Sequence, residues 1–369
     1  MEKNVQISDK RESNIELLRV FCILLIIMHH IVVHCIVIQL GDSKMYPAGE
    51  MFNNFVFYKR LIFFDFMACF GKMSNNIFIL ITGYFMCEKV DININKQLKK
   101  ILGQVLFASV FLMIISALYN AFFDNTFTST LPISIFNNEW YFIGYYVCII
   151  VIARVFLNKY IQNLDQKRYS ELLIILFAIV SIMFTKGLIS NISPNLTIVL
   201  TGVFLYSLGG YIKKYDMFKK VNIITLIIVL ILSFVIMGLS YRNYTMDNIL
   251  SSLKQGKQEY FQSIRLYEEN SLMSIVIAVC IFEIFRRIKI PKSNVINYIA
   301  SATFMIYLMH DNDFVRTIYR SFDWIKPFHD DVFGFMKMYF IYVFSIYVFG
   351  FVSYLIYKLV KRALHKIID

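Results

Sequence analysis

Long apolar runs alternate with short polar connections along almost the whole chain, and most runs are long enough to predict helices that cross a membrane. An α-helix needs about 20 mostly apolar residues to span the hydrocarbon core of a bilayer. Runs close to this length are expected at 15–38, 67–87, 101–123, 139–157, 171–187, 195–212, 222–240, 270–286, 295–310 and 336–358. The pattern predicts an all-α polytopic membrane protein with about ten transmembrane helices. The run 295–310 is short enough to be tilted or half-buried beside a cavity.

The composition excludes a soluble globular protein. The 369 residues are 58% hydrophobic and include 36 Phe, which is more apolar side chain than a soluble domain can bury. No linker or low-complexity tract is visible, so we expect one integral membrane domain over residues 1–369 without an appended soluble domain. The first run, after Lys10 and Arg11, is too long for the apolar region of a signal peptide and has no cleavage site. We therefore expect it to remain as the first span.

Neither disulfides nor a metal site is expected. The six cysteines lie almost entirely inside apolar runs without a C-x-x-C pair, which is typical of buried free thiols. His30 and His34 are spaced like a metal-binding pair, but they lack the glutamate of an H-E-x-x-H motif.

The net charge of +12 follows the expected topology. Connections on the same side as the amino terminus are rich in Lys and Arg, whereas those on the other side are longer and richer in Tyr, Asn and Asp. Because cytoplasmic connections carry the excess of Lys and Arg, we expect both termini in the cytoplasm. No basic-aromatic nucleic-acid module is visible, so no nucleic-acid partner is expected.

Ionisable residues inside the first apolar run make it the strongest candidate for a functional site. It contains one arginine and three histidines, Arg19, His29, His30 and His34. Ser13 and Glu16 form an S-x-x-E capping box, which predicts the start of the helix. Arg19 and His30 are close to three turns apart, so they share nearly the same face about 16 Å apart along the axis.

His30 is expected near the middle of the membrane. An ionisable side chain at that depth is costly and usually faces a cavity, which makes it a functional candidate by default. His34 lies one turn further along the same face, whereas His29 points away from it. The alternative is that His29 and His30 only form hydrogen bonds between helices.

Two other stretches have both a functional and a structural interpretation. The second span ends in Thr82-Gly83-Tyr84, where small residues also allow close helix packing. Lys96, Lys99 and Lys100 open the third span and suit phosphate binding, although topological charge explains them as well.

Polar and aromatic residues also mark the expected outer surface. Trp140 opens the fourth span, and its alternative is an anchor at the membrane interface. His310 and Asp311 follow the ninth span and suit a solvated turn, a proton relay or an acceptor-binding site. Tyr side chains in the outer connections suit stacking on sugars or, equally, the interfacial aromatic belt.

Four motifs occur in an order that resembles the membrane-bound acyltransferase-3 family. They are the Arg19–His30 pair, the F-x-x-x-[ST]-G-Y stretch 78–84, Trp140 followed by an aromatic residue, and the S-x5-Y-L-x-H stretch 301–310. The likeness covers essentially the whole chain. It is closest to stand-alone ten-span enzymes that O-acetylate bacterial capsular, exopolysaccharide or lipopolysaccharide sugars.

The resemblance implies transfer of an acetyl group from cytoplasmic acetyl-CoA to a sugar hydroxyl of a cell-surface polysaccharide or lipid-linked precursor. Arg19 matches the family's arginine near the cytoplasmic face, and His30 matches its essential histidine. Lys96 and Lys99 stand where the family often has R-x-x-R, and lysine supplies a point charge in place of a bidentate contact. We assign CoA contacts to Arg19, Lys96, Lys99 and Lys100, and substrate contacts to His29, His34, Thr82, Tyr84, Trp140, His310 and Asp311.

The residues suit this chemistry without the family. A sugar hydroxyl must lose its proton as it attacks a thioester, and an imidazole is well matched to that task near neutral pH. His30 is expected to act as a general base or to carry the acetyl group as a covalent intermediate. Arg19 is expected to hold a CoA phosphate at the cytoplasmic mouth.

Other functions fit parts of the pattern. Ten spans with polar residues at mid-membrane also suit a transporter or flippase for an acyl group or a lipid-linked sugar, although no inverted repeat is detectable. A membrane sensor or scaffold is a weaker alternative, and a succinyltransferase would act on the same kind of polymer. The expected setting is the plasma membrane of a bacterium, with the lipid bilayer and other polysaccharide-assembly proteins as partners.

Overall fold

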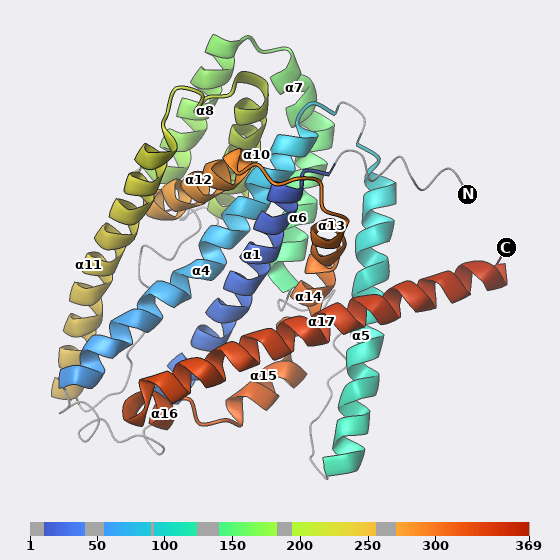
Figure 1. Ribbon diagram of the computed structural model, residues 1–369. Helices are drawn as coiled ribbons and strands as arrows, with labels where there is room; N and C mark the ends of the chain where they lie inside the picture. Colours follow the sequence, from blue (N-terminus) through green and yellow to red (C-terminus); the bar gives the residue numbers. More distant parts are fainter. Residues whose placement is uncertain are drawn as a thin grey trace.

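The protein is a bundle of helices (Figure 1). The computed structural model describes residues 11–40, 55–89, 92–123, 140–182, 194–255 and 271–368, and within these ranges it contains no β-strand. The first half contains α1 (Ser13–Ile31), the π-helical turn η3 (Val32–Ile36), α2 (Val37–Leu40), α4 (Phe55–Met86), α5 (Ile94–Phe123), α6 (Tyr141–Ile152), the π-helical turn η5 (Ala153–Leu157), α7 (Asn158–Gln162) and α8 (Gln166–Ser181). The second half contains α10 (Pro194–Tyr215), α11 (Ile223–Gln255), α12 (Leu272–Arg287), α13 (Asn294–Ala300), α14 (Thr303–His310), α15 (Asp313–Arg320), α16 (Ile325–Asp330) and α17 (Val332–Ile368).

The all-α membrane fold that the sequence predicts is confirmed. Each of the ten predicted runs coincides, over its described residues, with one helix or with consecutive helical segments. Six helical stretches are long and apolar enough to cross a bilayer, namely Ser13–Gln39, Ile94–Phe123, Tyr141–Gln162, Leu196–Tyr215, Ile223–Ser240 and Val332–Leu364. The chain is therefore a multi-pass membrane protein, while the count of ten spans and the direction of the termini stay predictions.

The remaining runs differ from an ideal span in length, charge or continuity. Helices α8 and α12 have 16 residues each, and α4 carries Lys59, Arg60, Asp65 and Lys72 in its first two thirds. The run 295–310 forms two short helices, α13 and α14, with a turn at 301–302 between them. Broken helices inside a membrane are tolerated where protein or a cavity surrounds them, and this one borders the cavity described below.

The last turns of α10 and α12 carry basic residues, Lys213 and Lys214 in α10 and Arg286 and Arg287 in α12. We call the end of the bundle where α1 begins and these helices end the basic end. Asn14 donates hydrogen bonds to the carbonyl oxygens of Phe285 (3.1 Å) and Arg286 (3.0 Å), at the end of α12. Lys213, near the end of α10, lies 3.7 Å from the carboxylate of Glu12. These contacts bring connections that the sequence assigned to the amino-terminal side to one end of the molecule.

A buried carboxylate holds the connections of the basic end together. Glu283 is fully buried, and its Oε1 lies 2.7 Å from Nη2 of Arg286 and 2.6 Å from Nε of Arg287. Arg287 also donates to the carbonyl oxygens of Phe218 and Val221, both at 2.5 Å. The α10–α11 connection is therefore tied to the end of α12.

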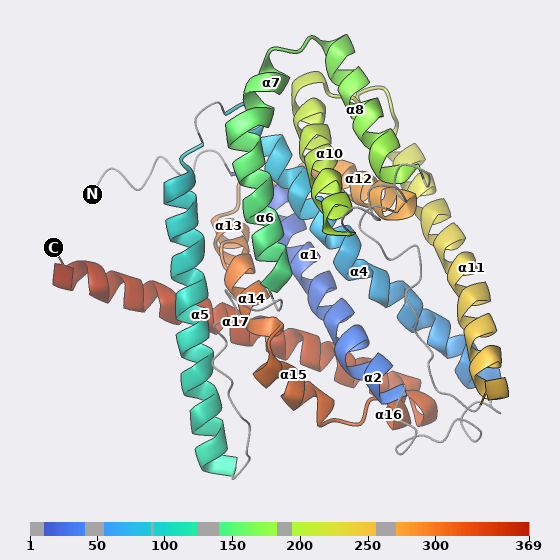
Figure 2. The same cartoon turned by 180° about the vertical axis from the view of Figure 1, so that it is seen from behind.

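Helix α4 occupies the centre of the bundle and packs against α1, α10, α11 and α12 (Figure 2). Its closest neighbour is α10, because a Cβ atom on Gly83 would clash with the carbonyl oxygen of Tyr206, and one on Gly209 with that of Leu80. Gly83, in the Thr-Gly-Tyr stretch, thus permits close helix packing.

The start of α1 differs from the prediction. The capping-box prediction is wrong, because Glu12 occupies the cap position without a side-chain hydrogen bond. The Ser13 hydroxyl instead donates to Asn297 Oδ1 (3.1 Å) and accepts from the backbone N–H of Ser293 (2.9 Å), so it is used to hold α13.

The prediction of free thiols is confirmed for all six cysteines, of which five are buried and Cys148 is half-buried.

Candidate active site

Two histidines from distant parts of the chain meet inside the bundle. Nδ1 of His30, at the end of α1, lies 2.8 Å from Nε2 of His310, the last residue of α14. The two ring planes are 5° from parallel, with centroids 4.8 Å apart. Helices α1 and α14 pack directly against each other, and α17 covers both. His310 is buried, at 3% exposed, whereas His30 is half-buried.

The hydrogen bonds of the pair define where the protons are. Nδ1 of His310 lies 2.6 Å from the carbonyl oxygen of Tyr307, and a carbonyl only accepts, so Nδ1 of His310 carries a hydrogen. Nε2 of the neutral His310 is then an acceptor, which requires that Nδ1 of His30 donates to it. The basic lone pair of His30 is consequently on Nε2.

A carboxylate stands beside the pair. Asp311 Oδ2 lies 3.4 Å from Nδ1 of His30, and Oδ1 lies 3.7 Å from Nε2 of His34. Arg316 in α15 holds the same carboxylate at 2.6 Å from its Nη2 and 2.7 Å from its Nε. Trp140 is buried and donates its indole N–H to the Asp311 carbonyl oxygen at 3.2 Å, so it braces this turn from inside the protein. We call His30, His34, His310, Asp311 and Arg316 the histidine cluster.

The other two histidines of the first span have different surroundings. His34 lies in the π-helical turn η3, and its ring centroid is 5.1 Å from that of His30. Such π-helical turns occur often at functional sites. His29 is buried and donates from Nδ1 to the Ala68 carbonyl oxygen of α4. A Cβ on Gly71 would clash with the His29 ring, so the glycine provides the room in which this imidazole packs.

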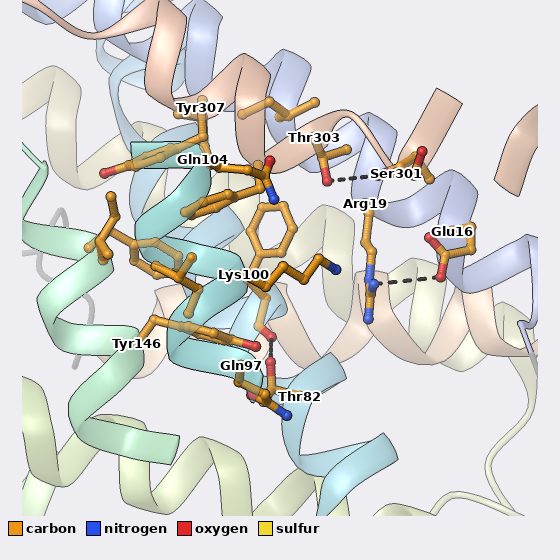
Figure 3. A pocket seen from close by; sticks show the side chains of 18 of the residues that line it. Glu16, Arg19, Thr82, Gln97, Lys100, Gln104, Tyr146, Ser301, Thr303 and Tyr307 are labelled. Atoms are coloured by element: carbon orange, nitrogen blue, oxygen red, sulfur yellow. Dashed lines mark hydrogen bonds and ion pairs between the residues drawn. The ribbon is translucent and has the colours of Figure 1, made fainter. Parts of the chain in front are cut away.

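A cavity of about 340 Å³ opens beside α1 at the basic end, and we call it the Arg19 cavity (Figure 3). Its lining from α1 follows one helical face through Glu16, Arg19, Ile23 and Ile26, which ends one turn before His30. Arg19 Nη1 lies 3.5 Å from the Glu16 carboxylate, and its buried Nε has no hydrogen-bond partner among the described residues.

The mouth and the deep part of the Arg19 cavity differ in chemistry. Charged and polar side chains line it near the basic end, among them Arg11, Arg19, Gln97, Lys100 and Ser301. Mostly apolar and aromatic side chains line the rest, among them Ile23, Ile26, Phe78, Phe142, Phe304 and Tyr307, together with the polar side chains of Thr82, Gln104 and Thr303. A charged mouth followed by an apolar channel suits an elongated ligand with an anionic end.

The structure divides the sequence-predicted binding residues into two groups. Arg19, Lys100 and Thr82 line the cavity, whereas Lys96, Lys99 and Tyr84 do not. Thr82 donates its hydroxyl to the Phe78 carbonyl oxygen at 2.7 Å. Tyr84 is buried among helices, with its hydroxyl 3.4 Å from Nζ of Lys213.

Tyr307 separates the Arg19 cavity from the histidine cluster. It lines the cavity, and its ring centroid lies 5.3 Å from that of His310 and 5.8 Å from that of Phe142. The space enclosed by the cluster itself is only about 10 Å³, near the smallest that holds a water molecule. The Arg19 cavity and the imidazole pair are thus adjacent, and Tyr307 contacts both.

The histidine cluster also contains side chains that can bind a metal ion. Among the described residues, His30, His310 and Asp311 place ligand atoms within 4.8 Å of one another. The two imidazoles are already hydrogen-bonded to each other, and Asp311 is paired with a guanidinium, which satisfies the groups that a cation would need. This arrangement favours acid–base chemistry over metal binding.

Some residues of the site were not assigned to it from the sequence. Arg316 pairs with Asp311 and Gln104 lines the Arg19 cavity, whereas Tyr307 belongs to the predicted motif 301–310 but had no role assigned to it. For Gln104 a signal was present, because residues 97, 100, 101 and 104 form one face of α5 at helical spacing. No such pattern marks Arg316 as a partner of Asp311.

Comparison with known proteins gives one family match. A family model described as an acyltransferase domain matches residues 12–357, which is most of the chain. No curated protein and no solved structure matches it. The chain therefore belongs to the membrane acyltransferase-3 family and is a multi-pass membrane acyltransferase.

Proposed function

We propose that the protein transfers an acetyl group from acetyl-CoA to a sugar hydroxyl of a cell-surface polysaccharide or its lipid-linked precursor. The basic end would face the cytoplasm of a bacterial cell, as the distribution of Lys and Arg favours. The donor would enter the Arg19 cavity from that side, and the acceptor would approach the histidine cluster from the other.

The donor part of the proposal is supported by the two chemistries of the Arg19 cavity. Arg19, Lys100 and Arg11 supply positive charge at its mouth, where the phosphates of CoA would bind. The apolar channel beyond them suits the pantetheine arm. The arm would carry the thioester towards Tyr307, whose ring contacts His310.

The chemical step follows from the proton positions in the histidine pair. Nε2 of His30 would take the proton of the sugar hydroxyl as its oxygen attacks the thioester carbonyl carbon. A new C–O bond forms, the C–S bond breaks, and the proton passes from His30 to the departing CoA sulfur. The positive charge that develops on His30 lies beside the Asp311 carboxylate, at 3.4 Å, and opposite charges this close attract.

One observation carries the proposal most directly, namely the hydrogen-bond chain from His30 through His310 to the Tyr307 carbonyl oxygen. It fixes the orientation of the imidazole in the same way that the third member of a catalytic triad orients its histidine. In the conformation described, Tyr307 stands between thioester and base, so its side chain must move during the reaction.

The test is the acetyl content of the surface polymer, measured by NMR in cells that produce the wild-type chain, His30→Ala or Arg19→Ala. Both variants are expected to remain in the membrane and to lose acetylation. His329→Ala serves as the control, because that histidine lies near the end of α16, where it is paired with Asp330, outside the proposed site. Unchanged acetylation in His30→Ala would refute the proposal.

The same spectra separate the alternatives. A succinyl signal in place of acetyl would change the donor but keep the mechanism. A polymer that reaches the surface unacetylated in wild-type cells, and fails to reach it without the gene, would favour a transporter.

A further inference from the structure

A buried acceptor oxygen on the wall of the Arg19 cavity lacks a partner. Gln104 is 4% exposed, and its Oε1 has no hydrogen-bond partner among the described residues. The side chain lines the cavity, and Figure 3 places it between Lys100 and Tyr307. Buried polar atoms in proteins are almost always hydrogen-bonded, so an orphaned one in a binding cavity points to a ligand.

The surroundings of Gln104 narrow the chemistry of that ligand. Gln104 is the last residue of the α5 face that lines the cavity, after Gln97, Lys100 and Ile101. The side-chain donors that line the cavity, among them Lys100, Thr303 and Tyr307, make no hydrogen bond to Gln104 Oε1. A ligand that satisfies Oε1 must therefore bring its own N–H or O–H group into a mainly apolar channel.

We propose that Gln104 Oε1 accepts a hydrogen bond from an amide N–H of the pantetheine arm of CoA. The proposal rests on the proposed function, because it assumes a CoA thioester in this cavity. Pantetheine carries two amide groups along a flexible chain that ends in the thioester sulfur. A hydrogen bond to one of them would fix how far the chain enters, and hence where the thioester stops relative to Tyr307. Gln104 is thus a positioning residue.

The experiment compares wild-type protein with Gln104→Leu, both full-length and reconstituted in lipid nanodiscs. Calorimetry measures the Kd for CoA and for the adenosine bisphosphate end of CoA without its pantetheine arm. Loss of one hydrogen bond predicts that Gln104→Leu binds CoA about fivefold to tenfold more weakly. The affinity for the adenosine bisphosphate is expected to be unchanged.

Thermal unfolding without ligand tests whether Gln104 instead has a structural role, because a structural role predicts a lower unfolding midpoint in the variant. Replacing a buried, unpartnered acceptor by an apolar side chain of similar size is neutral or stabilising, so the unfolding midpoint of Gln104→Leu should equal or exceed that of the wild type. Gln104→Met, which is unbranched like glutamine, repeats the measurement. A lower midpoint in both variants would overturn the proposal, because the oxygen would then be part of the fold.

The outcomes distinguish this inference from the donor assignment. If the wild type binds neither CoA nor the adenosine bisphosphate, the donor assignment fails and the role of Gln104 fails with it. If the wild type binds CoA and Gln104→Leu binds it equally well, only the role of Gln104 is refuted. Equal weakening for both ligands would also refute it, since the arm would not be the part recognised.

Discussion

Nδ1 of His30 lies 2.8 Å from Nε2 of His310, although 280 residues separate them in the chain. The contact forms because α14 ends beside α1, and α17 packs against both helices. Because the Tyr307 carbonyl oxygen fixes the proton on His310, this contact also determines which nitrogen of His30 is basic.

His310→Ala is expected to lower acyl transfer without removing the protein from the membrane. The substitution deletes the acceptor that orients His30, and hydrogen bonds that serve a charged group contribute about 1.5–3 kcal/mol, which corresponds to roughly a tenfold to hundredfold loss of rate. His30→Ala, which removes the base itself, should lose more, about a hundredfold or greater. Turnover of acetyl-CoA by purified protein with a polysaccharide acceptor measures both, and a larger loss in His310→Ala than in His30→Ala would contradict these roles.

Lys100→Ala should weaken binding of CoA, whereas Lys99→Ala should not. The two lysines are neighbours in α5, but only Lys100 lines the Arg19 cavity. An exposed ion pair contributes about 0.2–1 kcal/mol, so the loss for Lys100→Ala is expected to be a few-fold in Kd and to shrink at high salt. Calorimetric titration at two salt concentrations measures it. Equal effects of both substitutions would mean that the phosphates bind outside the cavity.

Gly83→Ala is expected to destabilise the bundle, because a methyl group there would clash with the backbone of Tyr206 in α10. Overpacking of this kind costs about 1–3 kcal/mol, or more where backbone must move. Gly144→Ala is the matched control, since outside its own helical turn no atom of the described residues lies within 4 Å of a Cβ at that position. Thermal unfolding in detergent should show a lower midpoint for the first variant and an equal or higher one for the second.

Glu283→Gln should also destabilise the protein, because Glu283 holds helices together at the basic end. The carboxylate is fully buried between Arg286 and Arg287, and loss of one charge from a buried pair typically costs about 3–5 kcal/mol. Asp330→Asn, at an exposed pair with His329, should change stability little. A comparable unfolding midpoint for the two variants would show that Glu283 is not required to hold α10, α11 and α12 together.

Helix positions could be predicted from the sequence because a backbone in lipid must satisfy its own hydrogen bonds, so every long apolar run has to be helical. His30 was recognisable for a related reason, since ionisable groups are rare near the middle of a membrane. Arg19 and His310 were recognised from the motifs that contain them. Local hydrogen bonds were harder to predict from the sequence. The Ser13 capping box was predicted wrongly, because the Ser13 hydroxyl forms hydrogen bonds with Asn297 and Ser293 at α13.

Contacts between helices could not be predicted from one sequence. Neither the pairing of Asp311 with Arg316 nor the separation of Lys100 from Lys99 follows from residue type, because both depend on how α5, α14 and α15 are rotated in the bundle. The orphaned oxygen of Gln104 is visible only once the packing around it is known.

The position of Tyr307 has a consequence for the fate of an activated acyl group. A thioester held below that ring would be screened from any water molecule beside the basic nitrogen of His30, so hydrolysis would be slow while no alcohol is bound. If arrival of the acceptor is what displaces the ring, the cell would lose little acetyl-CoA when polymer is scarce.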